Sequence, residues 1–93
     1  MKIGYIRVSS KEQSTDRQFV RLVDVCDKIM VEKISAKNIN RPVYQQTIKR
    51  LRKGDTLVIL SIDRAFRNTM DALGEVEKLR TRGVHFQIIN LAI

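Results

Sequence analysis

Residues 55–61, with the sequence DTLVILS, constrain the fold most strongly because they contain four consecutive apolar residues. A short run of this kind is typical of a strand in the middle of a sheet whose two faces are both covered. Such a strand needs helices on both sides and parallel neighbours reached through crossover connections. The sequence therefore predicts an α/β fold if the rest of the chain supplies further strands and helices.

The rest of the chain does alternate between strand and helix patterns. Residues 2–8, 28–32 and 84–89 are rich in β-formers and predict three more strands. Helical spacing of apolar residues predicts helices over 14–27, from Pro42 until Gly54 stops it, and from an Asn68 or Thr69 cap to about Arg82. We expect their inner faces to be Phe19, Leu22, Val23 and Cys26; Tyr44, Ile48 and Leu51; and Met70, Leu73, Val76 and Leu79. This order predicts a three-layer αβα domain with a mainly parallel sheet of four to five strands.

Length and composition limit the class of protein. Ninety-three residues make one domain, and 43% apolar residues suffice for a folded core. We expect a soluble, cytoplasmic protein, because the sequence contains neither a run long enough to span a membrane nor a signal peptide. Cys26 is the single cysteine, so we expect a buried side chain and no internal disulfide. With His85 as the single histidine, the usual zinc ligand set is missing.

The positive charge is concentrated in one segment. The chain carries a net charge of +8, and residues 33–54 contribute seven basic residues and no acidic one. This concentration predicts a surface for a polyanion such as nucleic acid. The alternative, for the run from Lys49 to Lys53, is that its cations stabilise the carboxyl end of a helix.

The polar residues that could carry chemistry follow the predicted strands. In open parallel sheets, ligands bind beyond the carboxyl ends of the strands, near the point where strand order reverses. The segments there are 9–13, 33–41, 62–68 and the residues after Asn90. Arg7 and Ser9 lie two residues apart and should share one side of the first strand. A hydroxyl beside a guanidinium can attack or bind a phosphate, although such a serine can also serve only as a turn or cap.

The end of the third strand adds more cations. Asp63, Arg64 and Arg67 occupy a predicted loop ahead of a helix whose N-terminus favours anions. A surface salt bridge would explain them as well. If the two segments meet, however, three arginines surround one serine, an arrangement that suits phosphoryl transfer because cations neutralise the non-bridging oxygens.

Two motifs resemble those of a known family. MKIGYIRVSSKEQSTDRQ resembles the opening of the resolvase/invertase serine recombinases, whose first strand ends in Y-x-R-V-S before a loop that contains Gln. The family's D-R-x-x-R signature is similar to residues 61–67, SIDRAFR, and residues 31–36 and 40–42 resemble its linking stretch. The resemblance covers essentially the whole chain and implies the resolvase-like catalytic fold.

The resemblance also implies roles for individual residues. Ser9 matches the nucleophile that forms a 5′-phosphoserine link and frees a 3′-hydroxyl. Arg7, Arg64 and Arg67 match the arginines that hold the scissile phosphate, and Asp63 matches an acid that orients them or assists proton transfer. Gln13, Glu32, Ser35 and Arg41 match further active-site positions, and Lys33, Lys37 and Arg41 are the expected contacts to DNA phosphates. The resemblance implies that no metal or other cofactor is needed and that the substrate is DNA. It also implies that the full-length protein forms dimers and tetramers and has no membrane partner.

The chain departs from the family pattern at a few points. Glu32 stands where many members have Asp, and Ala36 and Phe66 stand where Gly is common. Ser10 is a rival nucleophile, although strand alternation points it away from Arg7. Residues 1–93 match the catalytic domain, and the family's long helix and DNA-binding domain are missing. For this piece alone we expect a monomer or weak dimer that binds DNA weakly and without sequence choice.

Other function classes make different demands on the sequence. A phosphorylation-receiver domain would place Asp63 similarly but needs an acidic pair after the first strand, where Ser9 and Ser10 stand. A dinucleotide-binding enzyme lacks its glycine-rich loop. A non-catalytic nucleic-acid-binding or oligomerisation module, derived from a degenerate recombinase, remains open. The sequence leaves the target site undecided, as well as the choice between resolution, inversion and integration.

Overall fold

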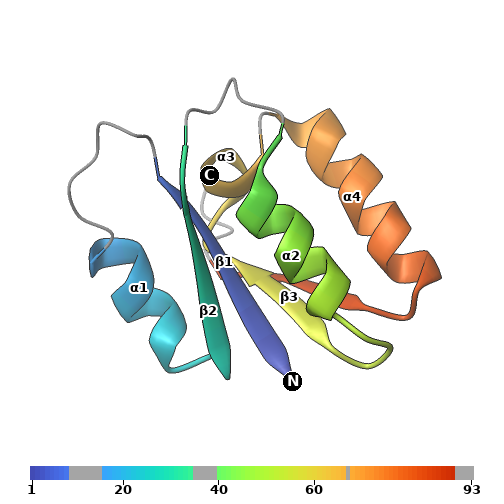
Figure 1. Ribbon diagram of the computed structural model, residues 1–93, viewed down its shortest axis with the longest axis horizontal. Helices are drawn as coiled ribbons and strands as arrows, with labels where there is room; N and C mark the ends of the chain where they lie inside the picture. The colour runs from blue at the N-terminus through green and yellow to red at the C-terminus, as the bar shows by residue number, and fades with distance from the viewer. Residues whose placement is uncertain (9–15, 35–39, 67, 90–93) are drawn as a thin grey trace.

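A computed structural model describes residues 1–8, 16–34, 40–66 and 68–89 of the chain. These residues form four strands and four helices in the order β1, α1, β2, α2, β3, α3, α4, β4 (Figure 1). The strands are β1 (Lys2–Val8), β2 (Lys28–Lys33), β3 (Thr56–Ile59) and β4 (His85–Ile88). The helices are α1 (Asp16–Val23), α2 (Pro42–Arg50), α3 (Ile62–Ala65) and α4 (Thr69–Thr81). None of the helices in these ranges is both long and apolar enough to cross a membrane.

The strands form one parallel sheet in the order β2-β1-β3-β4. The predicted central strand is confirmed, because β3 lies between β1 and β4, and Leu57, Val58 and Ile59 are fully buried. From β1 the chain moves outward to β2, and from β3 it moves the other way to β4. The strand order therefore reverses between β1 and β3, and the carboxyl ends of these two strands are where a parallel sheet of this kind places a ligand.

The two faces of the sheet carry separate cores, which confirms the three-layer αβα architecture. On one face, Ile3 and Tyr5 of β1 pack with Leu57 of β3 and with residues of α2, α3 and α4. On the other face, Ile6 and Val8 pack with Val58 and with Leu22 of α1. Successive strand residues point to opposite faces, so Arg7 shares the face of Ile3 and Tyr5. That face carries three of the four described helices.

The predicted inner faces of two helices were partly wrong. In α1, Leu22 is buried, but Phe19 is 41% exposed and Val23 is also exposed. The helix ends at Val23, so that Cys26 lies beyond it, half-buried over Gly4. Because α1 covers its face of the sheet near β1 and β2 without another described helix beside it, one apolar row suffices.

In α4, the buried residues are Ala72 and Leu79, whereas Met70 is 76% exposed and Leu73 is 59% exposed. The expected cap is present, because the Asn68 side chain accepts a hydrogen bond from the Asp71 N–H at 2.8 Å. The small side chain of Ala72 lets the helix lie close to the sheet. The buried face of α4 is therefore rotated by about one residue from the predicted row that contains Met70 and Leu73.

The segments around β3 also differ in detail from the prediction. Helix α2 begins at Pro42 as predicted, but it ends at Arg50, and Leu51 is already extended. Gly54 lies four residues after Arg50, in the turn to β3, and has a φ of 93°, which glycine adopts without strain. Residues 62–65, predicted as loop, form one helical turn that closes with the Phe66 N–H donating to the Ile62 carbonyl at 2.8 Å.

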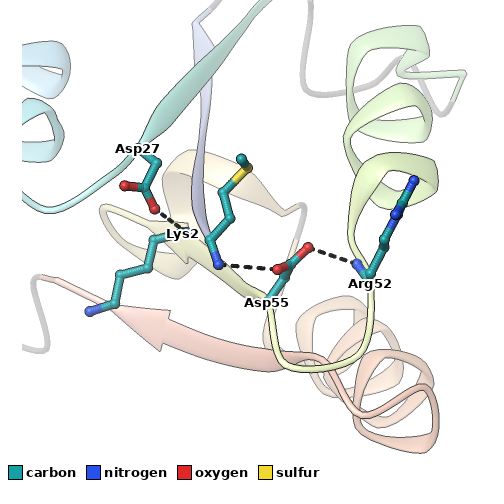
Figure 2. A network of polar contacts seen from close by, with 5 residues as sticks. Lys2, Asp27, Arg52 and Asp55 are labelled. Carbon is teal, nitrogen blue, oxygen red and sulfur yellow. Dashed lines mark hydrogen bonds and ion pairs between the residues drawn. The ribbon is translucent and has the colours of Figure 1, made fainter.

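Asp55 ties the start of β3 to the chain terminus (Figure 2). Its Oδ1 accepts from the Met1 ammonium at 3.1 Å, and its Oδ2 accepts from the Arg52 N–H at 2.9 Å. Beside it, the Lys2 N–H donates to Asp27 Oδ2 at 2.7 Å. These contacts hold the amino ends of β1 and β3 together, at the edge opposite the predicted site.

We predict that Asp55 makes stability depend on pH. The Arg52 N–H, and after it the Met1 ammonium, lower the pKa of Asp55 below its ordinary value. Because the pKa is lower in the folded chain, the stabilisation is complete above the unfolded value of about 4 and is lost as pH falls through the folded value. Asp55→Asn should therefore be less stable than the parent chain at neutral pH and should converge with it in acid.

Urea unfolding over a series of pH values measures this difference. Asp24→Asn, which removes an exposed aspartate from the turn after α1, controls for the loss of one negative charge. A gap between Asp55→Asn and the parent chain that stays constant down to the most acidic pH would contradict the prediction.

Candidate active site at the carboxyl ends of the strands

Arg7 links the end of β1 to the end of β3. It is the second-last residue of β1 and is half-buried. Its Nη2 donates to the main-chain carbonyl of Asp63 in α3 at 3.2 Å. Two stretches separated by 56 positions in the sequence therefore meet at the point where the strand order reverses.

Helix α3 carries two of the predicted site residues. The Asp63 side chain is exposed, and its Oδ1 accepts a hydrogen bond from the Ser61 hydroxyl at 2.7 Å. Its contact with Arg7 goes through the main-chain carbonyl, whereas the carboxylate is paired with the Ser61 hydroxyl at the surface. The backbone of Arg64 lies in the same helical turn.

Glu32 caps the amino end of helix α2. Its side chain is 1% exposed, and its position in β2 is paired with Arg7 in β1. Its Oε2 accepts from the Val43 N–H at 2.9 Å, and its Oε1 accepts from the Tyr44 N–H at 3.2 Å. A carboxylate is favoured here, because the first turn of a helix presents N–H groups without partners and the positive end of the dipole.

Tyr5 completes the contacts of Glu32. Its hydroxyl donates to Glu32 Oε1 at 2.5 Å. Burial, and after it the hydrogen bond to Glu32, raise the pKa of Tyr5 far above its ordinary value. The phenol therefore stays protonated and remains a donor at all physiological pH values. Glu32 has three donors on its two oxygens, and these join β1, β2 and α2 in one buried network.

Arg41 joins the start of α2 to the end of α3. Its Nη1 donates to the Ala65 carbonyl at 2.5 Å. Its guanidinium carbon lies 4.1 Å from the centre of the Tyr44 ring and 5.4 Å from that of Phe66. Cation–π contacts of this kind each contribute about 0.5–2 kcal/mol, with the larger values in sites shielded from water.

The two rings under Arg41 belong to an aromatic row in the core. Tyr44 lies 5.1 Å from Tyr5 and 5.9 Å from Phe66, and Phe66 lies 6.2 Å from Phe86 in β4. The Tyr44 hydroxyl is buried and has no hydrogen-bond partner among the described residues. Burial raises its pKa, and the Glu75 carboxylate nearby raises it further without meeting the geometry of a hydrogen bond.

The predicted site residues divide into two groups. Arg7, Glu32, Arg41 and Asp63 lie together at the carboxyl edge of the sheet, and Lys33 is exposed at the end of β2. The other predicted positions lie outside the described residues or, for Arg64, outside the described side chains: Ser9, Ser10, Gln13, Ser35, Ala36, Lys37 and Arg67. Sequence reasoning overlooked Tyr5, although its place two residues before Arg7 on the same strand was a usable signal.

Among the described residues of the basic segment 33–54, the cations form two groups. Lys33 and Arg41 lie at the carboxyl edge, whereas Lys49 and Arg50 lie in the last turn of α2, at its other end, and Arg52 and Lys53 follow it. A helix of nine residues separates the two groups by roughly 13 Å. At the far end, Arg82 of the turn after α4 donates from Nη2 to the carbonyl of Leu51, the residue that follows α2, at 2.6 Å.

The described part of the chain contains no group of three acidic, histidine or cysteine side chains that could hold a metal ion. Among the described residues, Arg7 and Arg41 supply positive charge at this site. What the arrangement offers is a half-buried guanidinium at a strand end, a surface carboxylate on the helical turn that this guanidinium contacts, and a second guanidinium held on aromatic rings.

The chain is similar to known proteins over almost its whole length. The family model described as "Resolvase, N terminal domain" matches residues 2–93. The chain is 40% identical over 94 residues to the serine recombinase gin of Escherichia phage Mu, covering 100% of this chain and 49% of that protein. It is 39% identical over 92 residues to the DNA-invertase hin of Salmonella typhimurium, covering 98% of this chain and 48% of that protein.

A solved structure supports the fold. The C-terminal catalytic domain of ISC1926 TnpA, an IS607-like serine recombinase, superposes with a TM-score of 0.75 at 21% identity, covering 96% of this chain and 67% of that one. The chain spans about half the length of the curated relatives it matches.

Proposed function

Because this chain belongs to the resolvase family of serine recombinases, whose N-terminal domain it matches over residues 2–93, we propose that it is the catalytic domain of an enzyme that cuts and rejoins DNA in site-specific recombination. The observation that best supports this proposal is the contact between Arg7 at the end of β1 and α3. It joins the strand that precedes Ser9 to the segment that contains Asp63 and Arg64.

In the proposed reaction, the Ser9 hydroxyl oxygen attacks the phosphorus of a DNA phosphodiester. A bond forms between the serine oxygen and phosphorus, and the bond from phosphorus to the 3′-oxygen breaks. The serine proton leaves to a base, and the 3′-oxygen takes up a proton and becomes a free hydroxyl. A phosphate diester is consumed and another is formed, so the 3′-hydroxyl of a second strand can reverse the step without a metal or a nucleotide cofactor.

We assign the charge in this reaction to arginines. Arg7, Arg64 and Arg67 would neutralise the non-bridging oxygens as charge builds up on them. Asp63 would orient these cations or accept a proton from its exposed position, and Gln13 and Ser35 would assist them. Lys33 and Lys37 would contact neighbouring DNA phosphates, contacts that fix position without reading sequence.

The network of Glu32 supports a different role for that residue. Its carboxylate is buried and its oxygens already accept three hydrogen bonds, so we propose that it supports the site by holding α2 and Tyr5 rather than by touching DNA. The partners proposed for the complete protein are DNA and further copies of itself, as dimers and tetramers.

We expect the full-length protein that carries this chain to form a covalent adduct with DNA at Ser9. Nicked duplexes made from genomic DNA of the source organism would trap the adduct, because the strand released beyond the nick diffuses away. After nuclease and trypsin digestion, mass spectrometry should find a nucleotide joined through its 5′-phosphate to the peptide of residues 8–11. Fragmentation of that peptide separates Ser9 from Ser10.

Two results would count against this proposal. A modification on Ser10 would move the nucleophile by one residue. Binding of the same DNA without any adduct, under conditions in which a related recombinase forms one, would favour the non-catalytic binding module instead.

A further inference from the structure

Arg41 and Phe66 form a contact that the proposed chemistry leaves unexplained. Arg41 immediately precedes α2, and Phe66 immediately follows α3. The Arg41 guanidinium rests against the Phe66 ring and donates to the carbonyl of the preceding residue, Ala65. The family resemblance makes Arg41 an expected contact to DNA phosphate, and in the structure its guanidinium contacts Ala65, Tyr44 and Phe66.

Both ends of this contact are firmly anchored. Phe66 is 2% exposed and packs between Tyr44 and Phe86. On the other side, the first turn of α2 is fixed by the buried Glu32, which accepts from the Val43 and Tyr44 N–H groups. Arg41 lies one residue before this capped turn, so the position of its backbone is set by β2 and α2.

We propose that Arg41 and Phe66 are positioning residues, a clamp that fixes α3 relative to α2 and thereby sets where the proposed catalytic residues of α3 lie. This inference rests on the proposed function, because it assigns a role in that reaction. In the clamp, the guanidinium holds the end of α3 by one hydrogen bond and by two aromatic faces. At the other side of α3, Arg7 holds the Asp63 carbonyl.

The geometry favours positioning over direct phosphate binding. Helix α3 is a single turn of four residues, too short to hold its orientation by its own hydrogen bonds. Its placement has to come from outside contacts, and those of Arg41 and Arg7 reach main-chain carbonyls at its two ends. Moving Arg41 onto a DNA phosphate would give up the carbonyl contact and release one end of the helix.

Two variants test the clamp from its two sides. Phe66→Leu keeps an apolar side chain in the core but removes the ring, and Arg41→Lys keeps the charge but removes the planar guanidinium. NMR spectra of the free chain should show both variants shifting the same backbone amide signals, those of residues 62–66. The matched control is Arg52→Lys, an exposed arginine beyond the far end of α2, which should leave these signals unchanged.

This measurement uses no DNA, so its result is separate from the outcome of the adduct experiment. If Arg41→Lys shifts only the amide signals of its sequence neighbours and leaves those of residues 62–66 unchanged, the proposed clamp is contradicted. Because Arg41 is only partly buried, that variant keeps the core intact and remains informative even if Phe66→Leu folds poorly.

Cleavage kinetics in the full-length protein distinguish positioning from phosphate binding. Each single variant should lower the rate of adduct formation about 10- to 100-fold, the loss expected from a misplacement of about 1 Å, without weakening DNA binding. The double variant should be little worse than either single variant, because both changes break one contact. A Phe66→Leu protein with normal cleavage, together with an Arg41→Lys protein that binds DNA more weakly, would make Arg41 a phosphate ligand and overturn the proposal.

Discussion

Replacing Ser9 with alanine is expected to abolish covalent attachment to DNA. A serine hydroxyl is the proposed attacking group, and alanine offers no atom that could form the phosphoester. Loss of the nucleophile typically lowers the rate by more than about 1,000-fold, which puts the adduct below detection. The measurement is the SDS-resistant band of protein bound to labelled DNA, formed by the full-length protein.

Ser10→Ala is the matched control for this experiment. It removes the same hydroxyl one residue later and should retain most of the adduct, because the family resemblance assigns the attack to Ser9. DNA binding of both variants, measured in parallel at one salt concentration, shows whether an effect belongs to chemistry or to affinity. An adduct that survives in Ser9→Ala would remove the basis of the proposed mechanism.

Replacing Glu32 with glutamine is expected to destabilise the fold strongly. The substitution keeps the shape of the side chain but places an amide donor on one of the two positions that now accept hydrogen bonds. If the amide nitrogen takes the place of Oε1, it faces the Tyr5 hydroxyl and the Tyr44 N–H, which are both donors. If it takes the place of Oε2, it faces the Val43 N–H. Loss of charged hydrogen bonds at a buried site of this kind costs about 2–4 kcal/mol, a large part of the stability of a small domain.

Urea unfolding followed by circular dichroism measures this loss at neutral pH. Glu77→Gln is the matched control, because it makes the same chemical change on the exposed face of α4, where the partner is Arg80. Its effect should be much smaller, since exposed ion pairs contribute little. Equal unfolding midpoints for the two variants would show that the Glu32 network does not stabilise the fold.

Glu32 also shows which parts of the site could be predicted from the sequence. The resemblance to the family marked it as a supporting position, and the sequence order placed it at the end of a strand. Its partners could not be predicted, because Tyr5 lies 27 positions away and Val43, at the start of α2, lies 11 positions away. Contacts between distant residues depend on strand register and helix packing, which local patterns do not encode.

The helices make the same point about packing. Apolar spacing predicted Leu22, Leu79, Tyr44 and Leu51 as buried, and all four are. It also predicted Met70 and Leu73, which are exposed, and overlooked Ala72. The contact face of α4 is set by how closely the helix can lie on the sheet. A small residue decides this distance as effectively as a large apolar one.

The sequence by itself determined the order of the elements apart from the short helix α3, the parallel sheet with its buried central strand, and the set of residues available for chemistry at the carboxyl ends of the strands. These follow from periodicity and from local motifs, which act between neighbouring residues. Only the tertiary structure decided that Arg7 reaches α3, that Glu32 caps α2 and that Arg41 rests on Phe66. The physical reason is that these contacts exist only after the sheet and its helices have brought distant segments within hydrogen-bonding distance of each other.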